Sequence, residues 1–117
     1  MKGMHPRLRT AFDAELARAR DAESRGQLPE AWHHLERAHV LSQPFAWPHV
    51  RVHGRMFGFA LRRRDARELL GQLPRLLLAG PGSLTGRAPQ GNTGGARVGL
   101  FQPMQTPPEL ASLLRPD

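Results

Sequence analysis

The chain has 117 residues, which is enough for one small domain with a single hydrophobic core but too few for two. It contains no cysteine, so disulfides, thiolate metal ligands and cysteine nucleophiles are excluded. The formal net charge is +7, and nearly all of the positively charged residues are arginines. Many arginines and no tyrosine are typical of a protein from a GC-rich genome, so this charge does not by itself indicate a nucleic-acid site.

Two helices are predicted in the first 45 residues. The first extends from Pro6 to Arg25, because apolar residues recur there every three or four positions and Gly26 suits a helix stop. The second begins at Pro29 and ends near Leu41, and the stretch "SQPFAWP" then breaks the chain.

Two further helices are predicted before residue 80. The third extends from Pro48 to Arg63, and the fourth begins at the N-cap residue Asp65, with Glu68 placed as in a capping box, and ends before "AGPG". Leucines dominate the fourth helix, so we expect it to share one core with the second helix through Leu35, Ala38, Leu69, Leu73 and Leu76.

An internal repeat relates the two halves of this region. The stretch "GQLPEAWHHLERA" from Gly26 aligns with "RDARELLGQLPRL" from Arg64 at an offset of 38 residues. A repeated helical hairpin of this kind resembles the tetratricopeptide (TPR) repeat, whose period is about 34 residues. The predicted fold class is therefore all-α, with two TPR-like hairpins made of four helices, and a concave face between the first and third helices that receives a protein or peptide.

The last third of the chain differs in composition. Residues 1–80 form the predicted hairpin region, and residues 81–117 form a Gly/Pro-rich segment with a short terminal helix, packed on the hairpins as part of one domain. Leu100 and Phe101 are the expected anchors of the segment. Its "GNTGG" stretch is interpreted as a tight turn that needs glycine, with an anion-binding nest as the alternative.

Five of the six histidines lie between Glu30 and Met56. His49 and His53 are four residues apart and share one helix face, and the hairpin brings His39 toward them. Three imidazoles are a ligand set that zinc accepts, and the thioether of Met56 would complete the set for copper(I). The predicted metal site is therefore His39, His49, His53 and Met56, with Glu36 as an alternative to Met56.

A plainer interpretation of the same residues stays open. Buried histidines often only pack in a core, and each ring would then bond to a different partner across the hairpin or in the "GNTGG" loop. Convergence of the ring nitrogens favours the metal site, and separate partners favour the packing role. His33 is expected to face solvent.

Four motifs in order carry a resemblance to a known family: "EAWHHLERAHVLSQ", "HVRVHGRM", "QLPRLLLAGPGSLTGRAP" and "GNTGGA". Together they resemble the bacterial family called domain of unknown function 3703, over about residues 10 to 114. The resemblance implies a short, all-helical protein and an association with heavy-metal tolerance, and it implies no catalytic activity.

Two functions are predicted from these patterns. The first is a non-enzymatic interaction module with an unknown protein or peptide partner, and the second is a small histidine-based metal-binding protein, with zinc or copper as its ion. No nucleophile motif or phosphate loop indicates an enzyme. Neither nucleic acid nor a membrane is an expected partner. The N-terminus lacks the apolar stretch of a signal peptide, so we expect a cytoplasmic protein.

Overall fold

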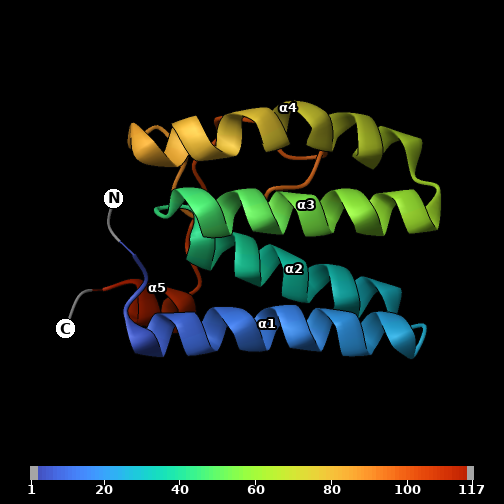
Figure 1. The fold of residues 1–117 in the computed structure, drawn as a ribbon, viewed down its shortest axis with the longest axis horizontal. Coiled ribbons are helices and arrows are strands. Elements are labelled where there is room, and N and C mark those ends of the chain that lie inside the picture. Colours follow the sequence, from blue (N-terminus) through green and yellow to red (C-terminus); the bar gives the residue numbers. More distant parts are fainter. Residues whose placement is uncertain (1–2, 116–117) are drawn as a thin grey trace.

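Five helices make up the part of the chain that the computed structural model describes, residues 3–115, and no strand occurs in that part. They are α1 (Pro6–Ser24), α2 (Leu28–Ser42), α3 (Ala46–Arg63), α4 (Ala66–Leu84) and α5 (Pro108–Leu114). The four long helices lie side by side in chain order, so α1 and α2 form one hairpin and α3 and α4 form the next (Figure 1). The all-α prediction, with four main helices and a short terminal one, is confirmed.

The ends of the helices follow from local chemistry. The side chain of His5 accepts a hydrogen bond from Leu8 N–H at the start of α1, and that of Asp65 accepts one from Glu68 N–H at the start of α4. Gly26 follows α1 at a φ of +73°, in the left-handed region where glycine is favoured. Asp65 therefore caps the start of α4, and Gly26 ends α1, for the physical reasons on which the sequence prediction depends.

The end of α4 differs from the prediction, because the helix continues through "AGPG" to Leu84. A proline lacks an N–H and so removes one intrahelical bond, but its carbonyl can still accept. Pro81 O accepts from Thr85 N–H, and Ser83 in the same turn bonds to α3 and to the chain before it. These contacts keep the last turn helical despite Pro74 and Pro81.

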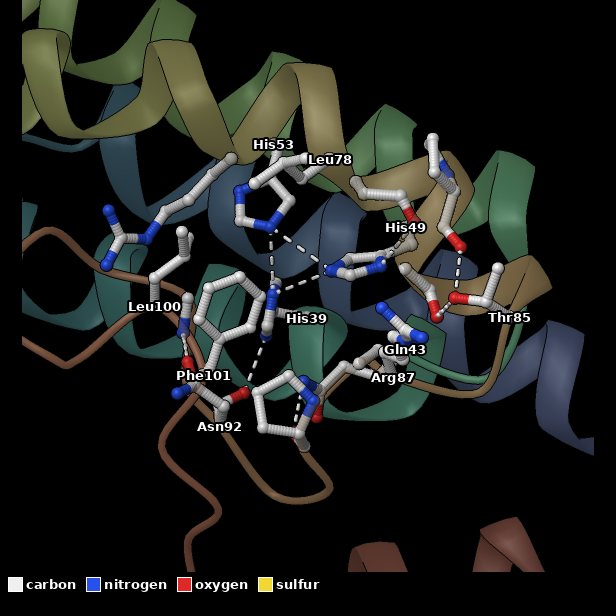
Figure 2. A pocket seen from close by; sticks show the side chains of 17 residues that line it. His39, Gln43, His49, His53, Leu78, Thr85, Arg87, Asn92, Leu100 and Phe101 are labelled. Carbon is white, nitrogen blue, oxygen red and sulfur yellow. Dashed lines mark hydrogen bonds between the residues drawn. The ribbon is translucent and has the colours of Figure 1, made fainter.

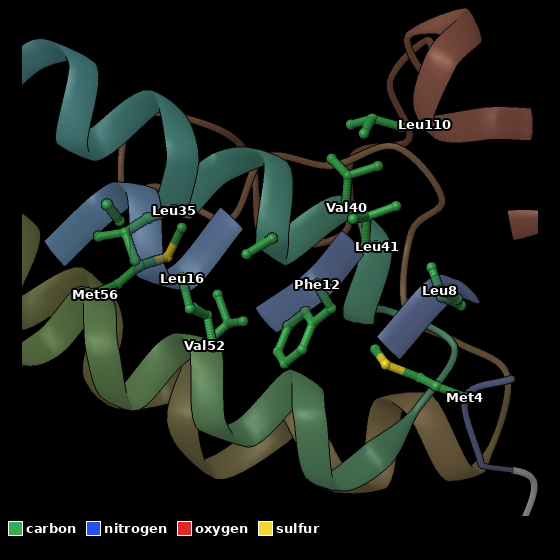
Figure 3. Packing of buried hydrophobic residues seen from close by; sticks show 12 residues of the cluster. Met4, Leu8, Phe12, Leu16, Leu35, Val40, Leu41, Val52, Met56 and Leu110 are labelled. Atoms are coloured by element: carbon green, nitrogen blue, oxygen red, sulfur yellow. The ribbon is translucent and has the colours of Figure 1, made fainter. Parts of the chain in front are cut away.

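The hydrophobic core lies where α1, α2 and α3 meet. Its largest fully buried side chains include Phe12 and Leu8 of α1, Leu41 of α2, and Val52 and Met56 of α3 (Figure 3). Leu110 of α5 closes one end of this core, with Leu113 and Leu114 packed beside it, as the sequence predicts. Burial of this apolar surface is the main favourable term for folding.

The leucines of α4 do not share this core, so that prediction is wrong. Of the three α4 leucines predicted for the core, Leu73 is 46% exposed, and Leu69 and Leu76 are half-buried and lie outside the core cluster. The face of α4 that is buried carries Gln72, Arg75 and Ala79. The helix turns this polar face inward because the space that it covers is filled by imidazoles and by polar loop backbone.

The Gly/Pro-rich segment does lie on the helices, but Phe101 is not its anchor. Phe101 is 67% exposed and Leu100 is only half-buried. Polar side chains of α4 bind the backbone of the segment instead: Glu68 accepts from Ala96 N–H, Gln72 donates to Gly94 O, and Arg75 donates to Val98 O. The segment is therefore fixed mainly by hydrogen bonds to the polar face of α4.

Candidate metal centre

Three histidines from two helices converge at one point. His39 lies in the last turn of α2, and His49 and His53 lie one turn apart on α3. Their Nε2 atoms are 3.0 Å apart for His39 and His53, 3.1 Å for His39 and His49, and 3.2 Å for His49 and His53 (Figure 2). The structure thus brings together the three histidines predicted as ligands, and we call them the triad.

The triad is buried and electrically neutral. Each of the three residues is at most 5% exposed. Burial, with a smaller contribution from the neighbouring rings, lowers the pKa of His49 to about 3 and the pKa of His39 well below its ordinary value. Burial likewise lowers the pKa of His53 to about 4. Neutral imidazole is the form that binds a metal ion, so near pH 7 the triad needs no deprotonation to become a ligand set.

The second nitrogen of each ring has its own partner. His39 Nδ1 lies 2.6 Å from Asn92 O, His53 Nδ1 lies 2.7 Å from Gln72 Oε1, and His49 Nδ1 lies 3.1 Å from Ala79 O and 2.8 Å from Ser83 Oγ. A carbonyl oxygen can only accept, so in each ring Nδ1 donates its hydrogen. The proton of each neutral ring is therefore on Nδ1, and each Nε2 presents a lone pair.

The groups behind these partners keep them in that orientation. Gln72 donates through its Nε2 to Gly94 O and to Glu68 Oε2, which leaves its Oε1 toward His53. Ser83 donates its hydroxyl hydrogen to Gln43 O, which leaves its oxygen free to accept from His49. Such outer hydrogen bonds commonly fix the tautomer and direction of histidines that ligate metals.

Three lone pairs that face one another at these distances repel unless a cation lies between them. The centre of a triangle with edges near 3.1 Å is about 1.8 Å from each corner, and a Zn–N bond is about 2.0 to 2.1 Å long. The three Nε2 atoms are therefore close enough to one another to hold one zinc ion together. The triad is a three-nitrogen cap that leaves one side of the ion open for a further ligand.

The "GNTGG" stretch forms the wall beside His39. Gly94 has a φ of +88°, and a Cβ at this position would lie 2.6 Å from Cδ2 of His39, so only glycine fits. Asn92 holds the turn by accepting from Gly94 N–H and donating to Gly99 O and Gln102 O. The turn interpretation agrees with this geometry, and the backbone of the turn also accepts the Nδ1–H of His39.

The other predicted site residues lie elsewhere. Met56 is fully buried in the hydrophobic core and does not line the cavity that the triad faces. Glu36 is also outside the triad. Among residues 3–115, no carboxylate belongs to this group of possible metal ligands. The side chain of His33 is 62% exposed, as predicted, and His34 Nδ1 lies 2.7 Å from Glu15 Oε2.

Sequence reasoning missed the residues that orient the triad. Gln72, Ser83 and Asn92 are polar residues among leucines, prolines and glycines, and only their burial distinguishes them. The sequence leaves a metal site, with converging ring nitrogens, and a packing role, with separate partners, as alternatives for the histidines. In the structure, converging nitrogens and separate partners occur together. The rings have separate partners through Nδ1 and converge through Nε2.

A family model described as "Protein of unknown function (DUF3703)" matches residues 6–114, which is nearly the whole chain. No curated protein and no solved structure matches the chain. Among the helices of residues 3–115, none combines the length and the apolar character that crossing a membrane requires.

Proposed function

This chain belongs to the DUF3703 family, and we propose that it is a small metal-binding protein whose ion is held by His39, His49 and His53. The observation that carries the proposal is the convergence of three Nε2 lone pairs within 3.2 Å of one another while every Nδ1 is engaged elsewhere. Ordinary packing of three histidines does not require this arrangement of tautomers.

The donor set favours a divalent first-row ion such as zinc. Imidazole nitrogen suits zinc, copper, iron and nickel, whereas magnesium and calcium prefer oxygen ligands. Copper(I) prefers soft sulfur ligands, and Met56 packs in the hydrophobic core and not beside the triad. A role in heavy-metal tolerance is consistent with such a site, because a protein that holds an ion lowers its free concentration.

Thermal unfolding of the protein purified with a chelator and then titrated with zinc tests the proposal. An ion that binds only the folded state stabilises it by RT ln(1 + [L]/Kd), or about 2.7 kcal/mol at one hundred times Kd. The melting temperature should therefore rise with zinc, and the rise should vanish in the double variant His49→Ala, His53→Ala.

Two single variants serve as controls for this titration. His33→Ala removes an exposed imidazole and should leave the rise unchanged. Met56→Leu keeps the core filled and should also leave it unchanged, whereas loss of the rise would make Met56 a ligand. An equal rise in the native protein and the double variant would place the ion elsewhere and contradict the proposal.

A groove between α1 and α3 supports the interaction module as a second proposed function. Its lining is apolar at Leu16, Leu35 and Phe59, and it carries Arg20, Arg55, Arg62 and Arg63. Glu23 also lines the groove and forms ion pairs with Arg62 and Arg63, which leaves Arg20 and Arg55 as the arginines for a partner. Burial and repulsion from neighbouring arginines lower the pKa of Arg55, so a negative group in the groove would be favourable. We propose an acidic peptide with an apolar residue as the partner.

Selection of peptides from a random library on the immobilised protein tests this second function. Enriched peptides should combine acidic with apolar residues, and their binding should fall when Arg20 and Arg55 are both replaced by glutamate. Selection of peptides without acidic residues, or equal binding to the double variant, would remove the groove as the docking site.

A further inference from the structure

The triad opens onto a cavity of about 270 Å³. All three imidazoles line it, and the apolar side chains of Leu78, Leu100 and Phe101 also belong to its lining (Figure 2). A water molecule takes about 30 Å³ in the liquid, so the cavity has room for several small molecules. Because the three imidazoles line the cavity, an ion held by them would have a coordination position left for a ligand from the cavity.

The cavity wall also carries a buried cation. Arg75 lines the cavity and is only 9% exposed, with Nη1 donating to Gly71 O at 2.8 Å and Nη2 donating to Val98 O at 2.6 Å. A guanidinium has five N–H groups, so these two bonds do not exhaust its donors. Burial is the main cause of the lowered pKa of His53, and the positive charge of Arg75 lowers it further.

The charges of this site do not balance when a divalent ion is added. Three neutral imidazoles would leave the charge of the ion at +2, and Arg75 adds a further positive charge. Glu68 interacts electrostatically with Arg75, but it does not line the cavity, and the triad includes no carboxylate. Uncompensated charge in an apolar environment is strongly unfavourable, so a ligand that brings negative charge to the ion lowers the free energy of the site.

We propose that the fourth ligand of the metal ion is a small monovalent anion held in this cavity, either hydroxide formed from a bound water or an inorganic anion that replaces it, with Arg75 as the positioning charge. The inference rests on the proposed metal site. Hydroxide is available near neutral pH because a zinc ion held by protein ligands lowers the pKa of its bound water to about 7. Arg75 favours the anion over neutral water through its charge and its remaining donors.

Cobalt(II) is a suitable probe, because its visible absorption bands report the ligands of the ion. The full chain loaded with cobalt should show these bands, and sodium azide added at constant ionic strength should change them in a saturable way. Bands that do not respond to azide would overturn the inference and leave the metal site intact. No bands at all, in a folded protein, would overturn the metal site together with the inference.

Variants of two arginines on α4 test the positioning charge. Arg75→Gln should raise the Kd for azide by about tenfold, since a hydrogen bond to a charged group is of this strength. Arg67→Gln, at an exposed position of the same helix, should leave the Kd unchanged. Cobalt should still bind both variants, because neither arginine ligates the ion and the loss of the positive charge at Arg75 does not disfavour a cation. Equal azide affinity in a cobalt-loaded Arg75→Gln protein would overturn the role of Arg75.

Discussion

The two sides of α2 face interiors of opposite character. Toward α1, residues such as Leu35 and Leu41 pack with Phe12 in an apolar core. Toward α4 and the Gly/Pro-rich segment, His39 meets imidazoles and loop backbone. One small domain therefore contains an apolar interior and a polar one, separated by the width of a helix.

The difference teaches what each interior contributes. Apolar burial stabilises the fold by roughly 25 cal/mol per Å² of surface removed from water. Buried polar groups cost free energy unless they are hydrogen-bonded, and Gln43 Oε1 is the one buried side-chain atom in residues 3–115 without a partner. The apolar interior supplies stability, and the polar interior holds the groups that we propose to bind a metal ion.

The largest expected effect comes from the same substitution made in a leucine of each region. Leu41→Ala should lower the free energy of unfolding by about 2 to 5 kcal/mol, because Leu41 is fully buried in the apolar core. Leu73→Ala should lower it by less than about 1 kcal/mol, because Leu73 is 46% exposed on α4. Urea denaturation measures both values, and similar losses in the two variants would contradict the arrangement of α4.

A pair of glycine substitutions tests the wall of the polar interior. Gly94→Ala and Gly86→Ala both place alanine at a positive φ, which should cost each variant about 1 kcal/mol or more in stability. Only at position 94 does the added Cβ meet the ring of His39, whereas nothing lies within 4 Å of it at position 86. Zinc affinity measured by calorimetry should therefore fall at least about tenfold in Gly94→Ala alone. Equal zinc affinities would show that the loop does not hold His39 in place.

The pH dependence of stability in the metal-free protein tests the polar interior through His49. The pKa of His49 is lowered to about 3 in the folded protein, while an unfolded histidine has its ordinary value near 6.5. Between these values the unfolded chain binds one more proton at this residue, so His49 contributes stability that is complete above pH 6.5 and is lost as the pH falls toward 3. Replacement of His49 by leucine should reduce the slope of stability against pH by about 1.4 kcal/mol per unit near pH 5.

Denaturation of both proteins at several pH values measures this slope. His33→Ala is the control, because it removes an exposed imidazole that lies outside the triad. An unchanged slope of stability against pH in His49→Leu would mean that the pKa of His49 in the folded protein is not lowered, which would contradict the prediction.

The sequence predicted the helices and the triad because both depend on local spacing. The four-residue separation of His49 and His53 fixes their common face, and the short connection after α2 brings His39 beside them. The orientation of α4 was not predictable in the same way. Its leucines recur with helical period, but so do Gln72, Arg75 and Ala79, and periodicity does not say which stripe meets the interior.

The remaining errors have a related cause. Met56 has helical spacing from His53 that suits a shared ligand set, but the rotation of α3 places it in the apolar core. The partners of the triad, Gln72, Ser83 and Asn92, come from α4 and from the loop that follows it. Contacts between residues so distant in the chain depend on the packed fold, and no short motif records them.

The fixed tautomers of the triad determine where protons go when an ion is loaded. Each ring keeps its hydrogen on Nδ1, bonded to a neighbour, and would bind the proposed ion through a nitrogen that carries none. Near pH 7 the three rings would therefore have no proton to give up. If water becomes the fourth ligand, as proposed, any proton released to the buffer on loading would come from that water. The heat of metal binding would then depend on the ionisation enthalpy of the buffer, and the size of this dependence would measure the one proton released.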